Sequence, residues 1–256
     1  MTALDSFARW TRAEIPGGGV RRFRVAFAAI WLTYDVLDLC LKGTGTSVAY
    51  WSGAPRLLQL EAIQLALIAA EAGLLVGWRA RRCAFAAFVL RAYEAYFFFR
   101  LNDFYYFSVV ALILSQCRLE SDPARPGAPA PEPAWPRDVL LAQAAWMYFA
   151  TALLKTSAVW VSGGHLFVRQ QYLQTICGWP YPAVYRAFVA TLGGNAFLAR
   201  LGLAGEFLLA GLLAFRAPKR PTVALAVALH GFAALALNVW FFGASMVAQA
   251  AFLLPD

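Results

Sequence analysis

The chain has 256 residues, of which 61% are hydrophobic and only 14% are charged. A soluble domain of ordinary composition has about 25% charged residues, so these proportions exclude that class and indicate an integral membrane protein. The net charge of +8 is compatible with nucleic-acid binding, but the basic residues form short clusters between apolar segments, as in cytoplasmic loops of membrane proteins. Nucleic acid is therefore excluded as a partner, and the lipid bilayer is the expected one.

Seven membrane-spanning helices are predicted after a cytosolic or interfacial N-terminal segment, residues 1–24. Helices are expected because lipid offers the backbone no hydrogen-bond partners, and several stretches approach the about 20 apolar residues that cross a bilayer. The predicted fold class is thus all-α, a polytopic transmembrane bundle that forms one domain over residues 1–256. The expected spans are residues 25–41, 57–78, 83–99, 104–117, 138–155, 197–215 and 221–242.

Two longer connections separate these spans. Residues 118–137 are polar and rich in proline, which predicts a cytosolic surface linker. Residues 156–196 contain two glycine pairs and two prolines, which predict broken, partly re-entrant helices on the outer face. The basic clusters lie mainly in segments on the same side as the N-terminus, so the predicted orientation is N-terminus inside and C-terminus outside.

Acidic residues within the predicted spans are the first candidates for function. An unpaired charge at mid-membrane costs roughly 2–4 kcal/mol, so these side chains are expected to face one another or a wet cavity. Arg91 and Glu94 have i, i+3 spacing and are expected to form a buried structural pair. Tyr148, Thr151 and Lys155 share one face of the fifth span. The acids within spans are Asp35, Asp38, Glu61, Glu71, Glu94 and Glu206.

Lys155 ends an apolar helix, one turn before Trp160 and the Gly163–Gly164 pair. One interpretation is an anchor at the membrane boundary, and the other is a base held where water is scarce. An amine accepts a proton only when it is uncharged, and low-dielectric surroundings favour that form. The carboxylate of Glu206, if adjacent, would instead keep the amine charged and make Lys155 structural. The sequence leaves both alternatives open.

Four stretches carry a resemblance to a known family. In YFATALLKTSAVWVSG, residues 148–163, an aromatic-rich helix reaches a lysine, then a tryptophan and a glycine. Three further stretches follow in order along the chain. A first helix covers residues 23–37, and an asparagine-bearing turn leads into an aromatic helix at residues 100–114. An acidic helix at residues 205–220 precedes a histidine helix at residues 229–246. Together they resemble vitamin K-dependent γ-glutamyl carboxylase and its bacterial relatives, the horizontally transferred transmembrane (HTTM) domain proteins.

The resemblance implies a multi-pass enzyme of a bacterial inner membrane with a lyase-type carboxylation chemistry. In the carboxylase, a lysine deprotonates reduced vitamin K, oxygen adds, and the resulting strong base takes a glutamyl proton so that carbon dioxide can react. Lys155 matches that lysine, His230 a family histidine and Asn102 an asparagine, whereas Asp103 stands where the carboxylase has a histidine. The implied cofactor is a reduced, vitamin K-like quinone.

Further expectations concern substrate, metal and partners. Tyr148, Thr151, Trp160 and Glu206 are expected to bind a lipophilic, quinone-like molecule from the outer side of the membrane. No metal site is predicted, because the cysteines and histidines have no metal-ligand spacing. Two alternatives remain: a proton-coupled transporter, suggested by the buried carboxylates, and a non-catalytic membrane subunit that docks a membrane or peptide partner through its outer loops or residues 118–137.

Overall fold

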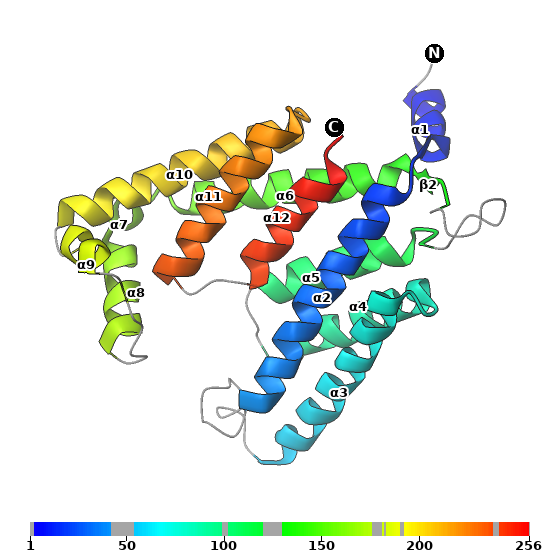
Figure 1. The fold of residues 1–256 in the computed structure, drawn as a ribbon, viewed down its shortest axis with the longest axis horizontal. Coiled ribbons are helices and arrows are strands. Elements are labelled where there is room, and N and C mark those ends of the chain that lie inside the picture. Colours follow the sequence, from blue (N-terminus) through cyan, green and yellow to red (C-terminus); the bar gives the residue numbers. More distant parts are fainter. Residues whose placement is uncertain are drawn as a thin grey trace. The chain divides into compact units, whose positions relative to one another are not determined.

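The computed structural model describes most of the chain as helices joined by short connections (Figure 1). Among the described residues the only strands are two residues long, so the predicted all-α class is confirmed. The chain divides into two compact units, Met1–Leu140 and Leu141–Asp256. The described residues are 3–41, 54–98, 102–119, 130–175, 181, 183–189, 192–237 and 241–255.

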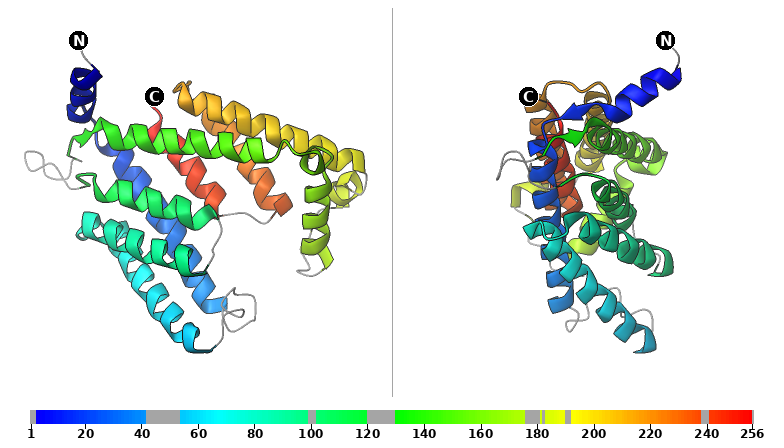
Figure 2. Two further views of the ribbon diagram at one scale, coloured as in Figure 1. Left: turned by 180° about the vertical axis from the view of Figure 1, so that it is seen from behind. Right: turned by 90° about the vertical axis from the view of Figure 1, so that its right-hand side faces the viewer.

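The first unit is a bundle in which consecutive helices pack on one another (Figure 2). Its core is aromatic: the Phe27 and Phe107 rings stack with centroids 4.9 Å apart, and Trp31 meets Phe107 edge-on. Each of these rings is almost fully buried. The elements are α1 (Ala3–Arg12), β1 (Glu14–Ile15), α2 (Gly18–Leu41), α3 (Ala54–Val76), α4 (Ala80–Phe98), α5 (Asn102–Ser115), β2 (Glu132–Pro133) and the start of α6 (Ala134–Leu154).

The two ends of the expected linker, residues 118–137, are ordered against the N-terminal segment. Strands β1 and β2 pair antiparallel. The buried carboxylate of Glu132 accepts the backbone N–H groups of Arg118 and Leu119, both at 2.6 Å. Residues 120–129 lie outside the described part of the chain. The predicted surface linker, residues 118–137, is therefore wrong at its C-terminal end. Glu132 is buried in the interior, and α6 already begins at Ala134.

In its described residues, the second unit contains the remainder of α6 and six further helices. The region expected to be broken contains three short helices, α7 (Ala158–Val161), α8 (Gly164–Thr175) and α9 (Ala183–Val189). The longer helices are α10 (Leu192–Ala214), α11 (Lys219–Leu237) and α12 (Phe241–Leu253). The predicted last span, residues 221–242, is wrong at its end, because α11 ends at Leu237 and Phe242 already belongs to α12.

The predicted number of seven spans is not confirmed. Among the described residues, one helix, Gly193–Ala214, is long and apolar enough to cross a membrane, and two shorter apolar helices cover Tyr105–Ser115 and Phe241–Leu253. Helices α2 and α4 have sufficient length, at 24 and 19 residues. Both also contain charged side chains, which lower their apolar character.

Candidate active site

A cavity of about 160 Å³ lies in the second unit, and its wall combines a few polar side chains with many apolar ones. The polar groups come from different elements: Lys155 directly follows α6, Glu206 lies on α10 and His230 on α11. Trp160 of α7 completes this side of the cavity. The principal apolar side chains are Leu166, Leu198, Leu203, Leu229, Phe232 and Phe242.

Lys155 and Glu206 form an ion pair on this wall. The Lys155 Nζ donates a hydrogen bond to Glu206 Oε1, and the ammonium lies 5.4 Å from the centroid of the Trp160 ring. The second carboxylate oxygen of Glu206 is buried and has no hydrogen-bond partner among the described residues. The side chains are 30% and 13% exposed. The pair is therefore accessible from the cavity but largely removed from solvent.

Tyr148 and His230 form a second polar pair. The Tyr148 hydroxyl oxygen lies 2.5 Å from His230 Nε2, and the tyrosine side chain is buried. Gly243 of α12 packs against the opposite side of the imidazole, where an added Cβ would lie 3.0 Å from Nδ1. The imidazole ring is thus held between a phenol on α6 and the backbone of α12, so its orientation at the cavity is fixed.

The corner between α7 and α8 sets the position of Trp160. Gly163 has φ of +80°, and a Cβ at this residue would collide with the backbone of Asn195 at the start of α10. The side-chain amide of Asn195 donates to Val189 O at 2.6 Å. The sequence places a glycine here because the chain must turn and approach α10 closely. The contact links α7, which carries Trp160, to α10, which carries Glu206.

The structure brings together some of the predicted site residues. Lys155, Glu206, His230 and Trp160 line one cavity, and Tyr148 joins them through His230. The Thr151 hydroxyl donates to Met147 O at 2.8 Å within its own helix, which does not support the predicted substrate contact. Asn102 and Asp103 belong to the first unit and begin α5, but their side chains lie outside the described residues.

Sequence reasoning missed the contribution of α12. Phe242 lines the cavity and Gly243 packs against His230. The predicted span 221–242 ends at Phe242 and leaves Gly243 outside any span, so no separate helix is predicted here. The glycine directly after two phenylalanines was the available signal, because an isolated glycine in a helical pattern often marks close packing.

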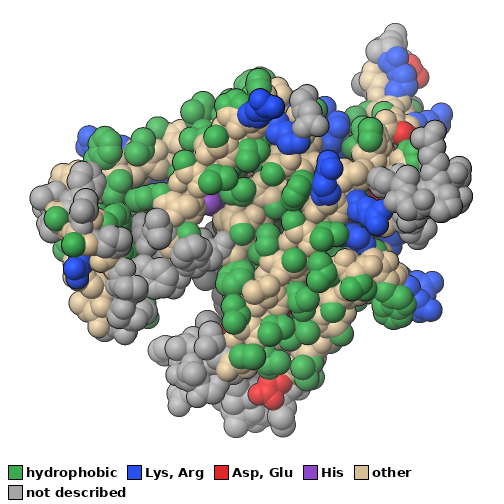
Figure 3. All heavy atoms as spheres, in the orientation of Figure 1, with side chains coloured by type: hydrophobic (Ala, Val, Ile, Leu, Met, Phe, Trp, Pro, Cys, Tyr) green, Lys and Arg blue, Asp and Glu red, His purple; other side chains and the backbone are tan. Residues whose placement is uncertain are grey.

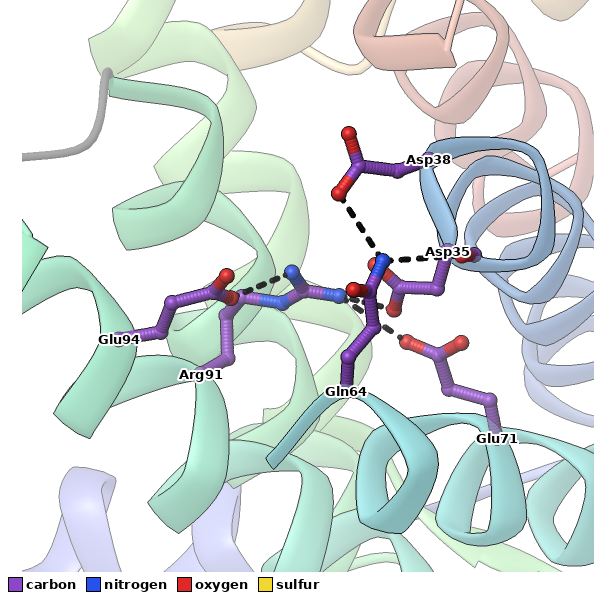
Figure 4. A network of polar contacts seen from close by, with 6 residues as sticks. All are labelled: Asp35, Asp38, Gln64, Glu71, Arg91 and Glu94. Atoms are coloured by element: carbon purple, nitrogen blue, oxygen red, sulfur yellow. Dashed lines mark hydrogen bonds and ion pairs between the residues drawn. The ribbon is translucent and has the colours of Figure 1, made fainter. Parts of the chain in front are cut away.

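The first unit contains a different polar centre, the Arg91 network, which consists of Asp35, Asp38, Gln64, Glu71, Arg91 and Glu94 (Figure 4). The Arg91 guanidinium donates to Asp35 Oδ2, to Glu94 Oε2 at 2.7 Å and to Glu71 Oε1 at 3.3 Å. Gln64 Nε2 donates to Asp38 Oδ2 at 2.9 Å and to Asp35 O at 3.0 Å. The expected Arg91–Glu94 pair is present, within a network that connects α2, α3 and α4.

Aromatic rings enclose this network. The Arg91 guanidinium carbon lies 4.8 Å from the Phe107 centroid and 5.5 Å from the Trp31 centroid. Both distances lie within the range of cation–π attraction. The Arg91, Asp35 and Glu71 side chains are at most 1% exposed. The network therefore lies in the packed interior of the first unit.

Comparison of the chain with protein-family models, with curated proteins and with solved structures gives no match. Within the described residues, no group of three or more His, Cys, Asp and Glu side chains could hold a metal ion. The resemblance to the HTTM and γ-carboxylase family therefore stays a prediction from sequence.

Proposed function

We propose that the chain is an integral membrane enzyme of the HTTM, vitamin K-dependent carboxylase-like type. In this proposal the cavity of the second unit binds the hydroxyl-bearing ring of a lipid-soluble, quinol-like substrate. The observation that carries the proposal is the Lys155–Glu206 pair on the wall of an otherwise mainly apolar cavity. Its volume of about 160 Å³ is similar to the roughly 150 Å³ apolar cavity that accommodates benzene, so one aromatic ring fits.

The Lys155–Glu206 pair is suited to accept a hydroxyl proton. It holds one exchangeable proton, which lies on the amine in the ion pair and on the carboxyl group in the neutral pair. A proton from the substrate would be taken up by the carboxylate in the ion pair and by the amine in the neutral pair. The product is the same in both cases: an ammonium beside a protonated carboxyl group, with the deprotonated substrate oxygen next to it. The ion pair is the arrangement in which the sequence predicts a structural lysine. In this proposal Lys155 is therefore the base only in the neutral form of the pair.

The apolar wall strengthens this chemistry. The ammonium attracts the negatively charged oxygen of the substrate, and such attraction is stronger where apolar side chains exclude water. His230, whose Nε2 contacts the Tyr148 hydroxyl, contributes a ring of fixed orientation to the cavity wall beside the pair. A bound quinol would supply the reducing power for oxygen-dependent carboxylation.

Identification of lipid that co-purifies with the chain is the first test. Mass spectrometry of the extract should detect a quinone, and the purified chain should bind reduced vitamin K. Ionisation of the bound quinol should be visible as a shift of its absorption to longer wavelength. Lys155→Met should abolish that shift, whereas Lys219→Met, the same change outside the cavity, should preserve it. A Lys155→Met variant with unchanged quinol ionisation and turnover would exclude the proposed role.

A second candidate function is proton-coupled transport through the first unit. The Arg91 network favours it, because one guanidinium meets three carboxylates in the buried interior. Uptake into proteoliposomes driven by a pH gradient should then be lost in Glu71→Gln. Glu61→Gln, which changes an exposed acid on the same helix, is the matched control. Equal uptake by both variants, or no uptake by the unmodified chain, would exclude this alternative.

A further inference from the structure

A basic cavity of about 720 Å³ lies in the first unit, beside the turn between α3 and α4. Among the residues that the structure describes, three arginines and no acidic side chain line it. Figure 3 shows basic side chains next to hydrophobic ones near this turn. The lining residues are Arg79, Arg81, Arg82, Phe85, Ala86, Ser115 and Gln116.

The local geometry keeps these arginines together. Arg79 has φ of +43° in the turn, and its guanidinium lies 5.2 Å from the ring of Trp78. Arg81 Nε donates to Ser115 O at 3.1 Å, which connects the start of α4 to the end of α5. All three arginines are exposed. Guanidinium groups arranged in this way suit a phosphate, because they form charge-assisted hydrogen bonds to its oxygens.

Exposed apolar side chains extend from the cavity along both helices. On α4 they include Phe85, Val89 and Tyr96, whose i, i+4 and i+11 spacing places them on one face. On α5, Tyr105, Val109 and Leu112 likewise share one face, and this series ends one turn before Ser115. The arginine cavity therefore lies at the end of two apolar stripes.

We propose that this cavity binds the phosphate headgroup of an anionic membrane phospholipid, with its acyl chains along the apolar stripes of α4 and α5. The positively charged arginines are complementary to a negatively charged headgroup, and basic pockets between membrane helices bind such lipids. Free phosphate would contact the arginines but leave the apolar stripes exposed. Arginines and apolar stripes together therefore favour a ligand with a phosphate group and hydrocarbon chains. The inference rests on membrane insertion of the chain and does not depend on catalysis in the second unit.

Native mass spectrometry of the purified chain in detergent tests this proposal. The probes are dioleoyl phosphatidylglycerol, dioleoyl phosphatidylcholine and inorganic phosphate. The chain should bind phosphatidylglycerol in preference to phosphatidylcholine, and Arg79→Gln/Arg82→Gln should weaken that binding roughly 10- to 30-fold. The control Arg216→Gln/Arg220→Gln removes the same charge elsewhere, and Arg216 also has positive φ. It should change binding less than about twofold.

The apolar stripe supplies an independent arm of the test. Phe85→Ser/Val89→Ser should weaken binding of the lipid while leaving the arginines in place. Equal affinity for the two lipids, or equal losses in the arginine and control variants, would overturn the proposal. Full competition by inorganic phosphate, with no effect of the stripe variant, would identify a free-phosphate site instead. Unfolding temperatures of all variants without lipid verify that each remains folded.

Discussion

The Arg91 network and the Lys155–Glu206 pair use the same attraction between a cation and carboxylates in different surroundings. Arg91 is 1% exposed and connects acids on α2, α3 and α4. Lys155 is 30% exposed, contacts one carboxylate and lines a cavity. Each centre leaves one buried carboxylate oxygen without a hydrogen-bond partner among the described residues, Glu71 Oε2 in the first and Glu206 Oε2 in the second. The first centre is enclosed in a packed bundle, whereas the second lines a cavity.

The identity of the cation fits each setting. The planar guanidinium of Arg91 presents several N–H donors and stays charged, so it can hold acids from several helices. The amine of Lys155 is a compact point charge, and it contacts one carboxylate at the wall of the cavity. The comparison therefore separates a buried centre that joins three helices from a pair at the wall of a cavity, where we propose the chemistry. We therefore expect substitutions in the Arg91 network to change mainly the free energy of unfolding. Substitutions in the Lys155–Glu206 pair should change mainly the ionisation of the bound quinol.

Arg91→Met should have the largest effect on stability. It leaves the carboxylates of Asp35, Glu71 and Glu94 without their cation, and breaking a buried ion pair typically costs about 3–5 kcal/mol. Denaturant unfolding in detergent measures the loss. Arg82→Met is the matched control, because it makes the same change at an exposed position of the same helix. Equal stability of the two variants would show that the network does not hold the unit together.

Gly163→Ala should have the next largest effect. The residue has φ of +80°, and the added methyl group would meet the backbone of Asn195. Such backbone strain costs about 1–3 kcal/mol. Because this contact links the helices of Trp160 and Glu206, the variant should also weaken binding at the cavity. Gly193→Ala is the control, since a Cβ there would meet nothing within 4 Å. A variant with unchanged unfolding and binding would contradict the role given to this corner.

Lys155→Met should reduce stability less than Arg91→Met does, because Lys155 is the partner of one partly exposed carboxylate and Arg91 is the partner of three buried ones. The same variant should abolish the absorption shift of the bound quinol, because the ammonium that stabilises the negatively charged oxygen is missing. Thermal unfolding in detergent, measured beside Arg91→Met, tests the contrast directly. A loss as large as that of Arg91→Met would mean that both centres are structural.

The sequence identified which acidic residues of the first unit lie in its helices, but it predicted few of the contacts that they make. Helical spacing identifies Arg91 and Glu94 as neighbours because both lie on one helix. The contacts of Arg91 with Asp35 and Glu71 depend on how three helices pack, which spacing along one helix does not determine. Glu61 is one of the acids within the predicted spans that are expected to face another charge or a wet cavity, yet it is exposed. Helix packing, more than position within a span, decided which acids became buried.

The second unit shows the same limit. The sequence singled out Lys155, Glu206 and His230, and the structure places all three on one cavity. The Tyr148–His230 contact joins residues 82 positions apart, so no local pattern could reveal it. Thr151 shares a helix face with Lys155, but its hydroxyl binds the backbone of its own helix. A shared helix face therefore limits which residues are candidates for a site, but it does not determine which atoms each side chain contacts.

Glu132 should give the smallest effect, as a pH dependence of stability in the first unit, outside the predicted spans. Burial raises the pKa of its carboxyl group above the ordinary 4.5, although the Arg118 and Leu119 N–H groups and nearby arginines oppose the shift. The folded chain therefore holds this proton more tightly than the unfolded chain. Its contribution is fully present below the ordinary pKa and is lost as the pH rises through the raised value.

Unfolding temperatures between about pH 4 and pH 8 measure this dependence in detergent. Glu132→Gln retains an oxygen acceptor but does not titrate, so the fall in stability with rising pH should be smaller in the variant. Glu14→Gln is the control, because it removes an exposed acid of the paired strand that contacts Arg118. A wild-type stability that rises across this interval while Glu132→Gln stays flat would mean that the two N–H donors outweigh burial and that Glu132 is charged in the fold.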